Sequence, residues 1–258
     1  MPTTKTDNHL RSSSQLIKLN RAATEEQRSQ LPRILTKEVS AHMPNLMEKT
    51  LSQAIAQRRD TPSFDGTPLP DADLKKILEA GLQAPSGYNL QPWRFIVVRS
   101  AEQKRRLRGA SFNQPKIEEA PVIIVACGDA DGWRKGDLEE VLRQGCEAGM
   151  PENYAEQART AIPNYLSNHP DFTAWLFKQV SIAFTSMMLM AEVLGYDTSA
   201  MEGFEEEKVR EVLKLPLSYH VVALLAVGHL SGEDKFDGGR FSMARTVFEE
   251  EYGRPLSL

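Results

Sequence analysis

The segment from Phe172 to Leu194 constrains the fold more than any other part of the sequence, because nearly every face of it is apolar. A helix of this kind must be covered on all sides, by protein or by lipid. Lys178, Gln179 and Glu192 interrupt the segment, which disfavours a membrane span. We therefore predict a long buried helix that lies against a sheet and against a second subunit.

The composition fits one large domain without affinity for polyanions. The chain has 258 residues, 41% of them hydrophobic and 26% charged, and its formal net charge is -4. This charge balance gives no general attraction to nucleic acid or to an anionic membrane. Two cysteines, Cys127 and Cys146, are too few for a disulfide framework, and the first residues lack a secretory apolar run. These features predict a soluble cytoplasmic protein.

The chain divides into an arm and a domain. Residues 1–45 are polar and irregular, so we predict a flexible N-terminal arm with one helix, Ala23–Gln30. Residues 46–258 form the predicted domain. In this domain, helices are expected from residue 46 into 58–60, from an N-cap at Asp71 to residue 82, within 138–169, at 172–194 and at 205–213. Strands are expected at 94–99, 121–127 and 221–227, and a loop at 197–204. Strands separated by helices indicate a three-layer α+β or α/β domain.

Familiar catalytic motifs are missing. The sequence contains no GxGxxG, no GxxxxGK[ST], no HExxH, no CxxC and no GxSxG. A dinucleotide-binding fold of the usual kind, a zinc protease and a hydrolase are therefore not indicated. We expect no metal site.

Three short patches carry the remaining chemistry. In the first, Arg58 and Arg59 end a helix, where two guanidinium groups suit a phosphate; they would equally complement the helix dipole. In the second, residues 84–93 (APSGYNLQPW) form a rigid loop whose Asn89 and Gln91 amides suit the edge of a planar heterocycle, or ordinary loop hydrogen bonds. In the third, 201–204 (MEGF), a glycine lets backbone approach a ligand closely, although a Glu-Gly pair also marks a plain turn.

Taken in order, these patches resemble the nitroreductase family. The resemblance runs from RRDxPxF through APSGYNLQPW and MEGF to a strand that ends in glycine, and it covers about residues 46–252. It implies a three-layer sandwich with a central, mostly antiparallel sheet, and an intertwined homodimer with FMN at the interface. It also implies NAD(P)H as the co-substrate.

The resemblance assigns FMN-binding roles residue by residue. Arg58 and Arg59 would hold the phosphate and ribityl chain, with Asp60 beside them. A C-terminal Arg240 would return to the phosphate, or else it is a solvated arginine of a turn. The flavin ring would be lined by Pro85, Ser86, Gly87, Asn89 and Gln91, with Glu202 and Gly203 next to its reactive nitrogen.

Two residues depart from the family pattern. Many members carry serine where this chain has Asp60, a carboxylate that is unfavourable beside a phosphate and that would instead orient Arg59. Pro62 stands where a basic residue often lies near the flavin, so the cation that balances the flavin's charge is not identified by the sequence.

The implied activity is hydride transfer from NAD(P)H through bound FMN to an electron-poor acceptor, nitroaromatic or quinone-like, by a ping-pong mechanism. No protein side chain is assigned as a catalytic acid or base. Phe112, Tyr154 and Tyr165 are candidates to stack on the small-molecule acceptor, or else they are packing residues. Flavin fragmentation, dehalogenation, and a flavin-binding sensor or storage dimer without turnover remain alternatives.

Overall fold

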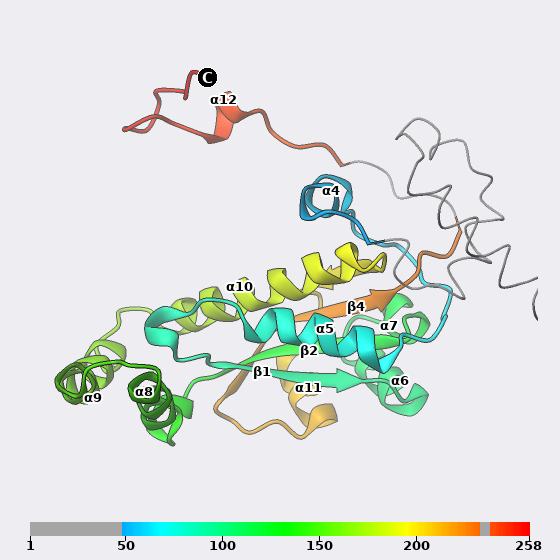
Figure 1. Cartoon of the computed structure of the whole chain (residues 1–258). Helices are drawn as coiled ribbons and strands as arrows, with labels where there is room; N and C mark the ends of the chain where they lie inside the picture. Colours follow the sequence, from blue (N-terminus) through cyan, green and yellow to red (C-terminus); the bar gives the residue numbers. More distant parts are fainter. Residues whose placement is uncertain (1–47, 233–237) are drawn as a thin grey trace, which may run out of the picture. The chain divides into compact units, whose positions relative to one another are not determined.

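A computed structural model describes residues 48–232 and 238–258 (Figure 1), and the predicted helix Ala23–Gln30 lies outside them. Four strands form one sheet: β1 (Trp93–Val98), β2 (Val122–Asp129), β3 (Asp197–Met201) and β4 (Tyr219–Gly228). Their order is β1-β2-β4-β3, and each neighbouring pair is antiparallel. The α+β class and the antiparallel sheet are thus confirmed.

The two central strands are buried on both faces, and alternate residues separate two cores. On one face, Ile124 and Leu225 pack with α5 (Asp71–Leu82) and α10 (Phe172–Val193). On the other, Ile123 and Leu224 pack with α6 (Ala101–Gly109), α7 (Lys116–Glu119) and α11 (Glu206–Leu213). Figure 1 shows these helices on opposite sides of the sheet. The period of two along each strand therefore builds the predicted three layers.

A third cluster lies beyond the end of the sheet. Residues 138–169 were expected to hold one or two helices, and they form two, α8 (Asp137–Glu147) and α9 (Glu152–Ser167). Their apolar faces pack on Trp175 and Leu176 of α10, and on Leu90 from the loop before β1. This end of the fold brings the second sequence patch next to α8 and α9.

The helix α10 lies against the sheet, as predicted for the apolar segment, and its packing on a second subunit stays a prediction. By length and composition it would pass as a membrane span, but so would the core helix of a folded domain. Its buried polar groups have partners elsewhere in the chain: Gln179 accepts a hydrogen bond from the Gly87 amide, and Glu192 pairs with Lys49 at 3.2 Å. Buried polar side chains that pair with other parts of the chain are typical of a helix in a protein core.

Three predicted boundaries were wrong. The segment expected as a loop, 197–204, begins with the strand β3, because Thr198 and Ser199 pair with β4 through backbone groups and need no apolar side chain. The first helix, α4 (Leu51–Gln57), stops before Arg58–Asp60, since Asp60 is extended and bridges Thr198. Pro70, not Asp71, is the N-cap of α5; Asp71 lies in the first turn, where a carboxylate favours the helix dipole.

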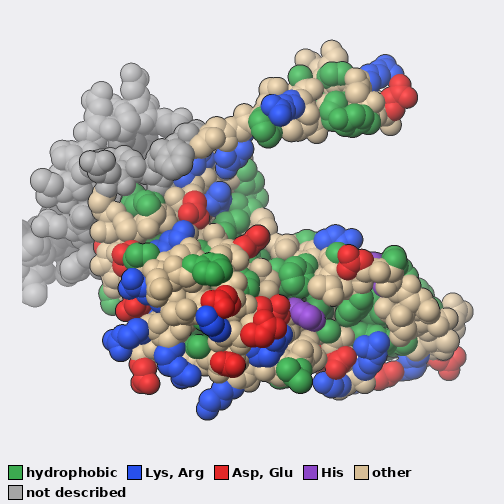
Figure 2. Space-filling view, turned by 180° about the vertical axis from the view of Figure 1, so that it is seen from behind, with side chains coloured by type: hydrophobic (Ala, Val, Ile, Leu, Met, Phe, Trp, Pro, Cys, Tyr) green, Lys and Arg blue, Asp and Glu red, His purple; other side chains and the backbone are tan. Residues whose placement is uncertain are grey.

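The C-terminal residues contain one short helix, α12 (Met243–Thr246), and a bridge between Phe248 and Pro255. Basic and acidic side chains are interspersed over the described part of the face in Figure 2. A surface of mixed sign agrees with the near-neutral composition.

Candidate functional site

The loop at residues 85–91 is held in an unusual backbone conformation. Tyr88, Asn89 and Gln91 have positive φ angles of 56°, 54° and 47°. Each such conformation costs a residue with a side chain on the order of 1–3 kcal/mol and persists only where the surroundings enforce it. Strain of this kind is concentrated at binding and active sites.

Hydrogen bonds from three directions enforce this conformation. The Ser86 Oγ accepts from the Gln91 amide at 2.9 Å, and the Gln91 side chain donates to the Asn89 carbonyl at 3.2 Å. From α10, the buried Gln179 accepts from the Gly87 amide at 2.7 Å. A Cβ on Gly87 would lie 3.1 Å from the ring of Trp175, so the loop also packs closely on this helix.

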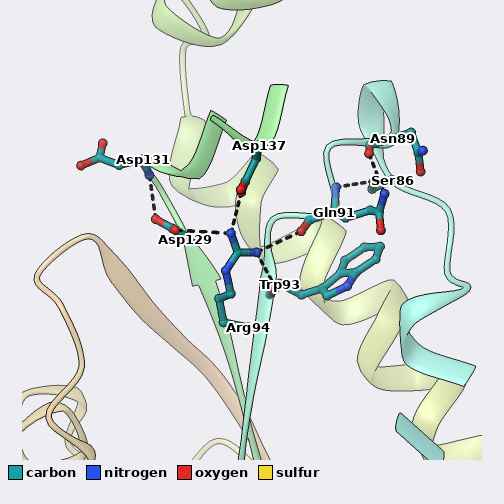
Figure 3. Close-up of polar contacts among 8 residues, drawn as sticks. All are labelled: Ser86, Asn89, Gln91, Trp93, Arg94, Asp129, Asp131 and Asp137. Atoms are coloured by element: carbon teal, nitrogen blue, oxygen red, sulfur yellow. Dashed lines mark hydrogen bonds and ion pairs between the residues drawn. The ribbon is translucent and has the colours of Figure 1, made fainter. Parts of the chain in front are cut away.

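Arg94 completes the support of the loop (Figure 3). One guanidinium nitrogen donates to the carbonyls of Trp93 at 2.9 Å and Gln91 at 3.3 Å. The other donates to Asp137 at 2.6 Å and lies 3.6 Å from Asp129. Burial disfavours the charge of Arg94, but the hydrogen bond to Asp137 and the charges of Asp137 and Asp129 contribute to a net rise in the pKa of the guanidinium. Arg94 is therefore a permanent cation.

The loop presents its own polar and aromatic groups outward. Asn89 is exposed, and in Figure 3 its amide points away from Arg94. Tyr88 meets Tyr165 of α9 edge to face at 5.5 Å between ring centroids, and Tyr165 meets His169 at 5.4 Å. Tyr154 is also exposed on α9. We call residues 85–91, with Arg94, Gln179 and Tyr165, the loop half-site.

A second group gathers the first and third sequence patches. Asp60 accepts hydrogen bonds from the Ser199 hydroxyl at 2.9 Å and the Ala200 amide at 3.2 Å. Lys116, at the start of α7, donates to Ser199 at 2.6 Å and lies 3.3 Å from Asp60. Asp60 thus fastens the segment after α4 to β3, beside a lysine that is mostly buried. The expected role of orienting Arg59 is not the one these contacts display.

The two arginines of this group differ in their contacts. The Arg59 guanidinium donates to the carbonyls of Ala56 at 2.8 Å and Arg58 at 2.9 Å. Arg58 is half-buried, and its amide caps α4 by bonding the Ala54 carbonyl. A cationic side chain therefore stands at the C-terminal end of α4, next to the Asp60–Lys116 pair.

Gly203 joins this group through the segment after α6. Gln114 donates to the Gly203 carbonyl at 2.8 Å, and a Cβ on Gly203 would meet Gln114 at 3.3 Å and Phe112 at 3.5 Å. Phe112 is exposed, and Glu202 beside Gly203 is exposed as well. We call residues 58–60, 112–116 and 199–203 the arginine half-site.

The structure therefore assembles the predicted residues into two groups. None of the contacts above joins one half-site to the other. Arg240 belongs to the described segment 238–258, where it is exposed and donates to the Gly239 carbonyl at 2.6 Å.

Sequence reasoning missed the residues that support both half-sites, namely Arg94, Gln179, Asp137 and Lys116. Arg94 carried a readable signal, because an arginine inside the strand WRFIVV needs a carboxylate partner once its neighbours are buried. Gln179 carried a weaker one, as a polar residue within an apolar helix. Lys116 had no local signal.

Comparison with known proteins agrees with the fold. The family model described as the nitroreductase family matches residues 55–229. An NADH dehydrogenase of Thermus thermophilus is 34% identical over 194 residues, which cover 75% of this chain and 93% of that protein.

Solved structures give the same result. A nitroreductase-like protein of Streptococcus mutans is 26% identical with a TM-score of 0.71, covering 78% of this chain and 98% of that one. A protein of Exiguobacterium sibiricum, described as a nitroreductase in complex with FMN, is 26% identical with a TM-score of 0.69, covering 76% and 95%. This chain belongs to the nitroreductase family.

Proposed function

We propose that the protein is an FMN-dependent NAD(P)H oxidoreductase that reduces electron-poor acceptors such as nitroaromatics and quinones. The observation that carries this proposal is the strained loop at 85–91, held by Ser86, Gln179 and Arg94 so that it presents the Asn89 amide outward. Related proteins named as an NADH dehydrogenase and as an FMN complex support the same chemistry.

The residues present fit FMN by their donor chemistry. Its phosphate needs cations, which Arg58 and Arg59 provide at the end of α4. Its ring edge needs both donors and acceptors, which an exposed asparagine amide supplies. Gly203 leaves little room for a side chain beside Gln114 and Phe112, so backbone can lie close to a flat ligand there.

The charge of the flavin has a candidate partner that the sequence did not indicate. Lys116 is 17% exposed and lies within the arginine half-site, 3.3 Å from Asp60. Lys116 supplies the positive charge that a basic residue at position 62 would otherwise provide, while Asp60 holds the Lys116 ammonium group in place. Asp60 itself then faces the lysine and β3 rather than the phosphate.

FMN held by these residues would supply hydride transfer between NAD(P)H and the acceptor, in two half-reactions of a ping-pong scheme. The protein's part is to bind and orient. Phe112 and Tyr165 present exposed rings at the two half-sites, where they can stack on a planar acceptor. Tyr154 is also exposed on α9, and we call Tyr154 and Tyr165 the acceptor wall.

We assign the two half-sites to different protomers of a homodimer. The arginine half-site of one chain would bind the phosphate and, through Lys116 and Gly203, one side of the flavin ring, while the loop half-site of the partner would bind the rest of the ring. Arg240 would close over the phosphate from the C-terminal segment. The protein would work in the cytoplasm, with residues 46–258 as the catalytic domain and 1–45 as an arm.

The direct test is an absorption spectrum of the purified protein, followed by addition of NADH or NADPH under nitrogen. We expect a flavin spectrum that bleaches on addition and recovers when a quinone is added. A colourless protein that does not take up added FMN would overturn the proposal. Bound FMN that no nicotinamide reduces would point to a sensor or storage protein.

A further inference from the structure

Arg94 is the point at which two structural elements meet. It is the second residue of the edge strand β1, and its side chain is 32% exposed. One guanidinium nitrogen serves the loop, through the Gln91 and Trp93 carbonyls, and the other serves α8, through Asp137. A planar guanidinium donates hydrogen bonds to groups on two sides at once from fixed positions, whereas a lysine ammonium has no donors fixed in this way.

On the loop side, Arg94 holds the last strained residue. Gln91 has a φ angle of 47°, its amide donates to Ser86, and its carbonyl accepts from Arg94. Both backbone polar groups of Gln91 are thereby fixed by side chains. Without the guanidinium, the Gln91 carbonyl has lost the partner that opposes relaxation to an ordinary backbone conformation.

On the other side, Arg94 holds the helix pair that bears the acceptor wall. Asp137 is the first residue of α8, and α8 packs on α9, which carries Tyr154 and Tyr165. The Asp137 carboxylate packs tightly against Gly132, because a Cβ on Gly132 would lie 2.2 Å from the Asp137 Oδ2. The ion pair therefore fixes the start of α8 relative to β1.

The loop and the helix pair also touch directly. Leu90 belongs to the apolar cluster of α8 and α9, and the Tyr88 ring meets Tyr165. These contacts reach the loop at Leu90 and Tyr88, away from the Gln91 carbonyl that Arg94 holds. Asp129, whose side chain is 8% exposed, stands 3.6 Å from Arg94 and keeps a carboxylate beside the guanidinium if Asp137 is removed.

We propose that Arg94 is a positioning residue that sets the flavin-binding loop and the acceptor-binding helix pair α8–α9 in one arrangement. Flavin affinity and acceptor affinity then both depend on Arg94, while only acceptor affinity depends on Asp137. This inference rests on the proposed function, because it takes the loop as the flavin site.

The experiment compares Arg94→Gln, Arg94→Lys and Asp137→Asn in the full chain. In Arg94→Gln we expect the Kd for FMN and the KM for a quinone each to rise about tenfold, as for the loss of one charge-assisted hydrogen bond. Arg94→Lys should not restore either value. In Asp137→Asn the KM for the quinone should rise while the Kd for FMN stays within about twofold of the wild type, since Asp129 retains Arg94.

Hydrogen exchange of the protein without FMN provides a second readout. The exchange rates of the Gly87, Asn89 and Gln91 amides should be higher than in the wild type in Arg94→Gln and equal to the wild type in Asp137→Asn. Arg143→Gln is the matched control, because Arg143 pairs with Glu140 and Glu147 on the exposed face of α8. It should change none of these quantities.

Each failure has its own meaning. If the wild type binds FMN but Arg94→Gln leaves both constants and the exchange rates unchanged, the positioning role is wrong. If Asp137→Asn raises both constants equally, the separate coupling to α8 is wrong. If the wild type binds no FMN, the proposed function fails, and exchange of the loop amides still decides whether Arg94 holds the loop.

Discussion

The two half-sites are built in different ways. In the loop half-site, the backbone is strained, and its peptide groups are satisfied by Ser86, Gln179 and Arg94 from within the fold. In the arginine half-site, Asp60 is 54% exposed, and the Arg58 side chain stands at a helix end. The peptide groups of the loop half-site are fixed by side chains before any ligand arrives, whereas the Arg58 side chain would be ordered by a phosphate. Phe112 and Asn113 in the arginine half-site also have positive φ angles, of 49° and 57°.

Because of this difference, changes in the two half-sites should affect FMN affinity and the stability of the folded protein differently. A change to the support of the loop should weaken both the folded protein and its hold on FMN. A change to the arginine charges should weaken FMN binding alone. Protomers with one defective half-site each should also be able to complement one another, if the two halves of a site come from different chains.

The largest expected effect is this complementation. Arg58→Ala removes the phosphate contact, and Asn89→Ala removes the ring contact and also places alanine at a φ angle of 54°. Each homodimer should therefore have low activity when the FMN concentration lies below its raised Kd. Mixed dimers carry one site with two native halves, and random reassortment should restore about a quarter of the wild-type activity. The measurement is NADH oxidation after joint unfolding and refolding. No recovery, despite proven heterodimers, would mean that both half-sites belong to one chain.

Arg58→Ala alone tests the charge half of the comparison. Loss of a charge-assisted phosphate contact should cost about 1.5–3 kcal/mol of FMN binding, measured by fluorescence titration. In the described part of the chain the Arg58 guanidinium makes no ion pair, so the thermal midpoint without FMN should not move. Arg105→Ala on the exposed face of α6 is the control. Unchanged affinity would remove Arg58 from the site.

Gln179→Met tests the support of the loop. It replaces a side chain that is 8% exposed and leaves the Gly87 amide without its acceptor. The Gly87 amide is half-buried, so leaving it unpaired should cost up to about 1–3 kcal/mol in the free energy of unfolding by urea. Flavin affinity should fall as well. The exposed Gln157→Met on α9 should change neither, and a loss of affinity without a loss of stability would contradict the comparison.

The sequence predicted those parts of the molecule that local pattern determines. The three strands with apolar, β-branched residues and the helix α10 stand where expected. The strand β3 was missed because Asp197, Thr198 and Ser199 are small and polar, and an edge strand forms through backbone pairing alone. Residues 85–91 were singled out by their turn chemistry and by a family resemblance, but the left-handed conformation of Tyr88 was not readable.

The supporting residues could not be predicted because their partners are distant in sequence. Gln179 meets Gly87 across 92 positions, and Lys116 meets Asp60 across 56. Only the packing of α10 on the sheet, or of α7 beside β3, brings such groups together. A single sequence shows that a polar residue in an apolar helix needs a partner, but not which partner it has.

The smallest effect is expected for Asn89→Gly, and it separates the strain of the loop from its chemistry. Asn89 has a φ angle of 54°, which glycine adopts without strain, but glycine also loses more chain entropy on folding. The free energy of unfolding should therefore change by less than about 1 kcal/mol. Lys214→Gly, at a φ angle of 55° outside both half-sites, is a control for the same backbone change. If the Asn89 amide binds the flavin edge, affinity should fall by about 0.5–1.5 kcal/mol in Asn89→Gly and remain unchanged in Lys214→Gly. Equal FMN affinity in both variants would mean that the loop binds the ring through backbone groups alone. The positive φ angle at residue 89 would then set the shape of the loop without placing a side-chain contact.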